Sequence, residues 1–172
     1  MQLPDGRCLW FRPIEPADAE RLRRFHRRLS PESQRMRFFT PLRELSPRMA
    51  KQFTNVDFET RGAVVLCHAG ENEIRGVGRF ESNGDGSMEV AFVLEDELQG
   101  KGLGKALLHL LATYLQSRGV TRLTAMVLPE NSAMLAVFRS CEFPVHIVNR
   151  DGVHFITIDM AEACNRPSLI AC

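Results

Sequence analysis

The chain has 172 residues, a formal net charge of +1 and 44% hydrophobic residues. This length predicts one domain, residues 1–172, with a hydrophobic core of its own. A net charge so close to zero gives no electrostatic argument for a nucleic-acid or membrane partner. No apolar run reaches the roughly 20 residues of a membrane span, and the N-terminus lacks the apolar region of a signal peptide.

The cysteines indicate the compartment. They number five, and no two of them form a Cys-x-x-Cys pair (Cys8, Cys67, Cys141, Cys164 and Cys172). An odd number without such a pair favours neither a disulfide framework nor a zinc site. We therefore expect reduced thiols in a cytoplasmic protein and no bound metal.

The first third of the chain predicts one strand followed by three helices. The segment 8–14 is apolar, ends at prolines and predicts the strand. Pro16 lies at the start of a helix that extends to about residue 29. Ser30 and Ser46, each followed by proline, are the caps of two further helices.

The first of these helices is rich in arginine. Its arginines could bind an anion or an acidic partner, or they could form a solvated face. Leu22, Phe25 and Leu29 recur at helical spacing and predict the buried side. We interpret the arginines as the solvated face opposite these three residues.

From about residue 62 the sequence pattern changes to strands. Segments 63–68, 74–80 and 87–94 predict three strands joined by short turns. The turn at 83–86, Asn-Gly-Asp-Gly, is a strong hairpin signal. Consecutive strands with short turns predict an antiparallel meander.

The last part of the chain alternates helices and strands. A helix-period apolar run begins at about Gly102 and ends at Gly119, which predicts a long helix. The strand 123–128 follows it directly and is expected to lie parallel to the strand before the helix. Asn131 is the cap of a short helix, and a strand over 153–160 closes the sheet.

The turn before the long helix is rich in glycine and lysine: Gln99-Gly100-Lys101-Gly102-Leu103-Gly104-Lys105. Glycine lets backbone N–H groups approach a ligand, and the first turn of a helix has unpaired N–H groups at its positive end. The turn therefore predicts a phosphate or pyrophosphate site, with an unliganded glycine-rich helix start as the alternative. It matches neither the Walker loop nor the dinucleotide fingerprint, because Ala106 and Lys105 stand at required positions.

These motifs, in this order, resemble the GCN5-related N-acetyltransferase (GNAT) family. The resemblance is most specific from Glu89 to Phe143 and covers nearly the whole chain in element order. Within the family, segments 30–39 and 127–131 are similar to the acetyltransferase domain of bacterial protein lysine acetyltransferases. The resemblance implies a mixed α+β fold with a mostly antiparallel sheet of six to seven strands, flanked by helices and splayed after the fourth strand.

The resemblance also implies an acetyl-CoA-dependent N-acetyltransferase that acts on a primary amine, in the first place on a protein lysine. The glycine-rich turn would bind the pyrophosphate, and the pantetheine arm would pair with an open strand edge. A backbone N–H near Val93 would polarise the thioester carbonyl. The implied cosubstrate-binding residues are Phe92, Val93, Leu94, Gln99, Gly100, Lys101, Gly102, Leu103, Gly104, Lys105 and Asn131.

The reaction needs a general base, because a lysine amine with a pKa of about 10.4 must lose a proton before it attacks. Glu89 shares one face of its strand with Ala91 and Val93. It also matches the position of the glutamate base in GCN5-like histone and bacterial protein acetyltransferases. We therefore predict that Glu89 is the general base.

One position departs from the family pattern. Many members have a tyrosine that protonates the leaving thiolate, and Phe138 stands there in this chain. Two alternatives to a protein lysine acetyltransferase stay open: an acetyltransferase of a small-molecule amine, and a non-catalytic acyl-CoA sensor. Phe138 favours the sensor and Glu89 opposes it. The sequence is compatible with a monomer or a homodimer.

Overall fold

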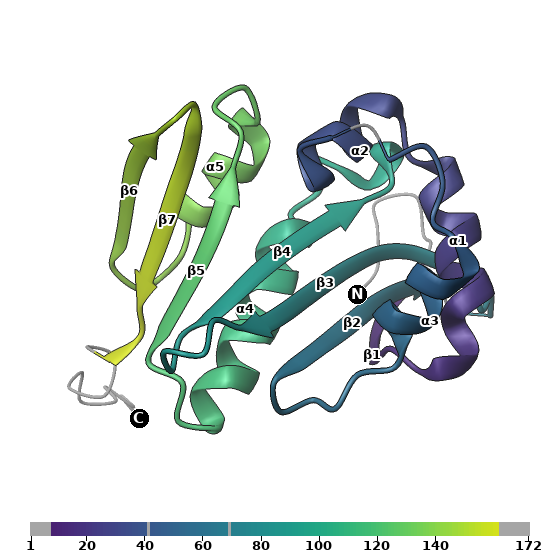
Figure 1. The fold of residues 1–172 in the computed structure, drawn as a ribbon, viewed down its shortest axis with the longest axis horizontal. Coiled ribbons are helices and arrows are strands. Elements are labelled where there is room, and N and C mark those ends of the chain that lie inside the picture. Colours follow the sequence, from purple (N-terminus) through teal and green to yellow (C-terminus); the bar gives the residue numbers. More distant parts are fainter. Residues whose placement is uncertain (1–7, 41, 69, 162–172) are drawn as a thin grey trace.

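Seven strands form one mixed sheet in the computed structural model, which describes residues 8–40, 42–68 and 70–161 (Figure 1). Their order is β1-β2-β3-β4-β5-β7-β6, with β4 and β5 parallel and the other neighbours antiparallel. The strands are β1 (Leu9–Pro13), β2 (Arg61–His68), β3 (Ile74–Ser82), β4 (Met88–Leu94), β5 (Arg122–Val127), β6 (Val145–Arg150) and β7 (Val153–Asp159). The predicted α+β class and mostly antiparallel sheet are confirmed.

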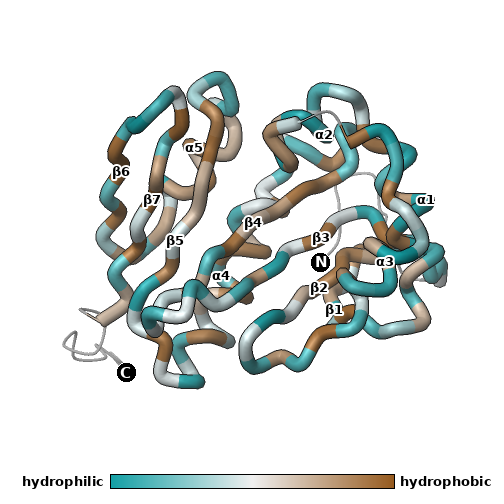
Figure 2. Tube along the Cα trace, viewed as in Figure 1, coloured by the Kyte–Doolittle hydropathy of each residue, from teal (hydrophilic) through white to brown (hydrophobic). Residues whose placement is uncertain are grey.

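Helices cover both faces of this sheet (Figure 1). They are α1 (Ala19–Arg28), α2 (Pro31–Phe38), α3 (Pro47–Thr54), α4 (Leu103–Ser117) and α5 (Ser132–Arg139). On one face, residues of α1 such as Phe25 pack on Val65 and Val77. On the other face, α4 and α5 pack on the sheet through a larger apolar cluster that includes Phe92 and Leu107. Figure 2 shows the hydrophobic residues that recur along β4 and β5.

The predicted caps hold the starts of the short helices. Ser30 Oγ accepts a hydrogen bond from the Ser33 N–H at 3.1 Å. Asn131 Oδ1 accepts one from the Met134 N–H at 3.0 Å. Each bond satisfies a donor that the first turn of a helix cannot pair internally. Helix starts predicted from serine and asparagine are therefore confirmed.

The arginine-rich helix α1 is held by the chain's own carboxylates. All five of its arginines form ion pairs with aspartate or glutamate, as Arg28 does with Glu95 at 2.6 Å. Leu22, Phe25 and Leu29 are 5%, 2% and 4% exposed, as predicted for the buried side. These pairs support a structural face rather than an anion-binding surface.

One strand was not predicted. β6 follows α5 and pairs with β7, so β6 rather than β7 is the edge of the sheet. Asp151 and Gly152 connect the two strands with φ angles of +51° and +76°. Two consecutive positive φ angles are typical of a type I′ hairpin turn, for which Asp-Gly is a favoured sequence. That dipeptide is the sequence signal from which β6 could have been found.

The sheet opens between its fourth and fifth strands. β4 and β5 pair only at Met88 with Leu123 and at Glu89 with Thr124, whereas β4 pairs with β3 along its whole length. Beyond Glu89 the two strands diverge, as Figure 1 shows. The predicted splay is confirmed. It leaves one edge of β4 with unpaired backbone groups, which can bond to an added extended chain.

Candidate functional site

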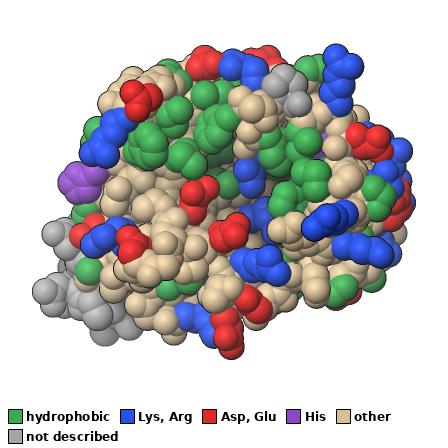
Figure 3. Space-filling model, in the orientation of Figure 1, with side chains coloured by type: hydrophobic (Ala, Val, Ile, Leu, Met, Phe, Trp, Pro, Cys, Tyr) green, Lys and Arg blue, Asp and Glu red, His purple; other side chains and the backbone are tan. Residues whose placement is uncertain are grey.

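A cleft of about 680 Å³ lies where β4 and β5 diverge. Clefts of roughly 300–1,000 Å³ are typical of small-molecule sites. Figure 3 shows the hollow in the middle of this face, with apolar, acidic and basic side chains around it. The predicted site residues that line the cleft are Glu89, Phe92, Val93, Leu94, Gln99, Gly100, Gly102, Gly104, Lys105 and Asn131.

The backbone of β4 presents alternate residues to β3 and to the cleft. The Glu95 N–H donates to the Arg75 carbonyl at 2.9 Å. Hydrogen-bonded positions alternate along an antiparallel pair, so Val93 bonds to β3 as well. The polar groups of Phe92 and Leu94 therefore point to the open edge. The backbone N–H that is predicted near Val93 to polarise the thioester carbonyl would then be that of Phe92 or Leu94, because Val93 bonds to β3.

The turn from β4 to α4 leaves open space in front of two glycines. Gly100 and Gly102 have φ angles of +71° and +79°, and no atom lies within 4 Å of a Cβ built on either. The first hydrogen bond inside α4 runs from the Ala106 N–H to the Gly102 carbonyl at 3.1 Å. The N–H groups of residues 103–105 therefore precede the internal bonding of the helix. This arrangement fits an anion at the start of α4.

The other predicted residues of this turn differ in what they contact. The Leu103 side chain is fully buried in the core, so only its backbone can face a ligand. A Cβ on Gly104 would meet Val137 Cγ2 at 3.0 Å, so this glycine lets α4 and α5 pack closely. Lys105 lines the cleft, whereas Lys101 is exposed and does not line it.

Two amide side chains lie at the walls of the cleft. Gln99 Nε2 donates to the Leu94 carbonyl at 3.2 Å and to Ser33 Oγ at 3.0 Å. Gln99 therefore ties the end of β4 to α2. Asn131 uses its Oδ1 to cap α5, and its Nδ2 makes no hydrogen bond within the described residues. The Asn131 amide can therefore donate to a ligand in the cleft.

Glu89 lies where the two strands part. Its neighbours across the sheet are Glu81 on β3 and Thr124 on β5. The side chain is half-buried and lines the cleft, and it makes no hydrogen bond or ion pair among the residues that the structure describes. A carboxylate that is not otherwise engaged can accept a proton from a group bound beside it.

Arg37, in the last turn of α2, lines the same cleft. Its guanidinium lies over the Phe38 ring at 5.1 Å from the ring centroid. Burial lowers the pKa of Arg37, and the negative charge of Glu89 opposes that shift. Arg37 was not predicted as a site residue, because only the packing of α2 over the sheet brings it near Glu89. Arg37 belongs to segment 30–39, on which the family resemblance partly rests, but no local pattern relates it to Glu89.

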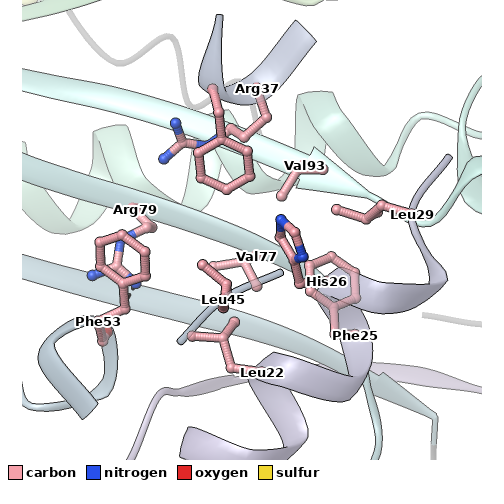
Figure 4. Close-up of a pocket in the computed structure, with 11 residues that line it drawn as sticks. Leu22, Phe25, His26, Leu29, Arg37, Leu45, Phe53, Val77, Arg79 and Val93 are labelled. Atoms are coloured by element: carbon pink, nitrogen blue, oxygen red, sulfur yellow. Dashed lines mark hydrogen bonds between the residues drawn. The ribbon is translucent and has the colours of Figure 1, made fainter. Parts of the chain in front are cut away.

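A smaller cavity of about 40 Å³ adjoins the cleft, and Arg37 and Val93 line both (Figure 4). His26 is 2% exposed there, and neither of its ring nitrogens has a hydrogen-bond partner. Arg79 donates from Nη1 to the Phe53 carbonyl at 2.9 Å and lies over the Phe53 ring. Burial and the charge of Arg37 lower the pKa of Arg79 to about 10.

Met36 of α2 and Phe39, which directly follows this helix, also line the cleft. Phe39 has a φ of +60°, a left-handed conformation that is uncommon for a bulky residue. Such conformations persist where the surrounding structure enforces them, often at ligand sites. Arg35 of α2 forms an ion pair with Glu130, next to Asn131, and so bridges the two sides of the cleft.

The position expected to hold a tyrosine hydroxyl is apolar. Phe138 is 1% exposed, and its ring lies 5.9 Å from that of Phe92. Among the described residues, no group of three or more His, Cys, Asp or Glu side chains could hold a metal ion. Cys8, Cys67 and Cys141 are free, and Cys164 and Cys172 lie outside the described residues. In the same part of the chain, no helix is long and apolar enough to cross a membrane.

Known proteins share this sequence pattern. Residues 9–144 match the family described as "Acetyltransferase (GNAT) domain". The chain is 31% identical over 135 residues to "Acetyltransferase PA5475" of Pseudomonas aeruginosa, an alignment that covers 77% of this chain and 73% of that protein. "Acetyltransferase Pat" of Mycolicibacterium smegmatis is 29% identical over 136 residues, which are 78% of this chain and 40% of that protein.

Solved structures share the fold. The crystal structure of the GNAT domain of S. lividans PAT is 34% identical, with a TM-score of 0.83 and coverage of 92% of this chain and 94% of that one. Spermidine N-acetyltransferase from Vibrio cholerae, solved with CoA and spermine, has the same fold at 18% identity and a TM-score of 0.71, with coverage of 91% and 98%. The chain therefore belongs to the GNAT family of acetyltransferases, enzymes that use acetyl-CoA.

Proposed function

We propose that this protein transfers an acetyl group from acetyl-CoA to a primary amine, in the first place the side-chain amine of a protein lysine. The likeness to the GNAT domain of S. lividans PAT supports the lysine acceptor. The single observation that supports the chemistry is the unengaged Glu89 carboxylate at the open edge of β4. The cytoplasmic location, the single domain and the choice between monomer and homodimer stay predictions.

The residues of the cleft fit acetyl-CoA, which supplies an activated acetyl thioester. The open space at Gly100 and Gly102, with the N–H groups of residues 103–105, would receive the pyrophosphate. The unpaired backbone groups of Phe92 and the N–H of Leu94 would bond to the pantetheine arm, whereas the Leu94 carbonyl already accepts a hydrogen bond from Gln99. The Asn131 amide would add a further donor.

In the proposed reaction, Glu89 accepts a proton from the acceptor ammonium, so that the neutral amine can attack. A backbone N–H at the open edge of β4 stabilises the negative charge that develops on the carbonyl oxygen. The new C–N bond forms as the C–S bond breaks, and the nitrogen releases its second proton to solvent. Because Phe138 has no proton to donate, the thiolate leaves as such or takes its proton from solvent.

The test is Glu89→Gln, which keeps the size of the side chain and removes its basicity. General-base catalysis contributes about 10²–10⁴-fold, so kcat on a lysine peptide should fall by that factor at neutral pH. Affinity for acetyl-CoA, measured by calorimetry, should be retained. Glu81→Gln is the matched control, because Glu81 lies directly opposite on the same face but is exposed.

Equal loss of turnover in both variants would contradict a specific role for Glu89, and unchanged turnover in Glu89→Gln would contradict the base. Binding of acetyl-CoA by the wild-type chain without transfer to any amine would favour the acyl-CoA sensor. Transfer to small amines but not to lysine peptides would favour the small-molecule acetyltransferase.

A further inference from the structure

Two guanidinium groups lie at the end of the cleft that Glu89 occupies, away from the glycine-rich turn. Arg37 lines the cleft itself, and Arg79 lies behind it in the wall of the smaller cavity. Figure 4 shows the two side chains extending from α2 and β3 on the same side of that cavity. Each lies over an aromatic ring, Arg37 over Phe38 and Arg79 over Phe53.

Neither guanidinium has a carboxylate within 4.0 Å among the described residues. The five arginines of α1 differ, since each of them pairs with a carboxylate. Two acidic residues, Glu81 and Glu89, share this face of the sheet, directly opposite each other on β3 and β4. They act on the two cations only through space, so Arg37 keeps all of its N–H donors for a ligand.

This charge pattern constrains the acceptor. A lysine ammonium that approaches Glu89 is attracted by the carboxylates of Glu89 and Glu81 but repelled by the charges of Arg37 and Arg79. A carboxylate carried beside that ammonium would offset the repulsion. It would also satisfy a partly buried guanidinium, whose planar fork matches a carboxylate in two parallel hydrogen bonds.

The walls around this end of the cleft suit a linear amine. Met36 of α2, Phe39 directly after it and Met126 of β5 supply apolar contacts of the kind that an aliphatic stem needs. Arg79 is anchored by its bond to the Phe53 carbonyl, so Arg37 is the guanidinium that can turn to a ligand. The acceptor end therefore combines a base, an apolar channel and one unengaged cation.

We infer that the protein prefers an acceptor whose reactive amine is accompanied by a carboxylate, and that Arg37 binds this carboxylate while Glu89 takes the proton from the amine. The inference rests on the proposed function and specifies its acceptor. The carboxylate can belong to an acidic residue next to a protein lysine or to a small amino acid. Arg37 is thus a specificity-determining residue for the acceptor.

The experiment compares acceptors that differ only in the carboxylate. One pair of capped peptides carries Gly-Asp-Lys-Gly or Gly-Asn-Lys-Gly, and a second pair places the Asp or Asn after the lysine. The third pair is 4-aminobutyrate and n-butylamine. For each pair, kcat/KM is measured with acetyl-CoA, and acceptor affinity is measured by calorimetry with CoA present.

We expect the carboxylate-bearing member of at least one pair to have a kcat/KM about tenfold higher or more, which corresponds to about 1.4 kcal/mol. A preference confined to the peptides identifies a flanking acidic residue, and one confined to 4-aminobutyrate identifies a small amino acid. In Arg37→Gln the ratio should approach one, and Arg37→Lys should restore part of it. The control Arg27→Gln, which alters an exposed arginine of α1, should keep the ratio.

Binding and turnover separate the two proposals. Transfer without any preference for the carboxylate would overturn the inference and leave the proposed function standing. A binding preference that depends on Arg37, without transfer, would support the anion site and contradict the proposed reaction. A preference that persists in a folded Arg37→Gln variant would overturn the assignment, and thermal melting checks that the variant is folded.

Discussion

The two faces of β4 differ in burial and in charge, although their residues alternate along one strand. Toward α4, Val90, Phe92 and Leu94 are 1%, 4% and 9% exposed and belong to the main core. Toward the cleft, Glu89 and Val93 are half-buried, and the carboxylate of Glu89 has no partner among the described residues. The same strand therefore supports the fold with one face and a candidate reaction with the other.

Along β4, every second side chain thus contributes mainly to stability, and the side chains between them face the site of the proposed reaction. Apolar side chains that leave water account for most of the stabilisation on the α4 face. The Glu89 carboxylate forms no ion pair among the described residues and lies opposite the like charge of Glu81, so it adds little to stability. Variants at adjacent positions should then have opposite consequences.

The largest effect is expected on the apolar face. Phe92→Ala removes a buried ring that packs on Phe138, and it should lower the free energy of unfolding by about 3–5 kcal/mol. Glu89→Gln should change that free energy by less than about 0.5 kcal/mol. Urea denaturation followed by circular dichroism measures both. Comparable losses in the two variants would contradict the separation of the faces.

Two glycines in different turns have the same backbone conformation. Gly102 in the glycine-rich turn and Gly84 in the β3–β4 hairpin have φ angles of +79° and +80°, and neither has an atom within 4 Å of a built Cβ. Valine at either position should cost about 1–3 kcal/mol of stability through backbone strain. Only Gly102→Val should also weaken acetyl-CoA binding, because its side chain enters the predicted pyrophosphate site.

Calorimetry with acetyl-CoA separates the two glycine variants. We expect at least about a tenfold loss of affinity, or about 1.4 kcal/mol, in Gly102→Val. Gly84→Val should bind like the wild type. Equal affinity in both variants would remove the glycine-rich turn from the binding site.

The cleft face also continues into the small cavity around His26. Burial lowers the pKa of His26 below its usual value of 6.5. The unfolded chain then binds a proton more readily than the folded one, so stability is lost as the pH falls below about 6.5. Each unit of lowering corresponds to about 1.4 kcal/mol.

Substitution of His26 tests this pH dependence. In His26→Phe, the free energy of unfolding should fall less steeply as the pH falls from neutral to the lowered pKa. In the control His146→Phe, which replaces an exposed histidine, this slope should stay as in the wild type. Denaturant unfolding at a series of pH values gives the slopes. A slope that His26→Phe does not alter would assign the acid sensitivity to other groups.

Local patterns were enough to predict most of the fold. Ser30 and Asn131 indicated helix starts, and the Asn-Gly-Asp-Gly turn indicated a hairpin, because each depends on bonds within a few residues. The direct link from α4 to the next strand predicted the parallel pair. β6 was missed because its edge position leaves it without a strong apolar pattern, with only the Asp151-Gly152 turn to mark it.

Only those site residues that lie in one continuous segment of the chain were predictable from the sequence. Glu89, the glycine-rich turn and Asn131 lie between residues 89 and 131, and the structure brings them to one cleft. Arg37 lies in the last turn of α2 and Phe39 directly follows it, and no local signal relates that helix to β4. Contacts of this kind depend on the tertiary packing of α2 over the splayed sheet. At the acceptor end, only Glu89 was therefore predictable from the sequence.

The smallest expected effect concerns the ion pair between Arg35 and Glu130, which joins the α2 side of the cleft to the α5 side. Both side chains are exposed, and the hydrogen bond from Arg35 lowers the pKa of Glu130. Surface ion pairs of this type contribute little, so Arg35→Ala should speed the release of CoA by only about two- to fivefold. Stopped-flow displacement measures the rate, and added salt should reduce the difference.

The reversed pair, Arg35→Glu with Glu130→Arg, should restore slow release if the charge link itself holds the two sides together. Failure of the reversed pair, with both single variants folded, would mean that α2 is held by the bonds of Ser33 and Asp96 instead.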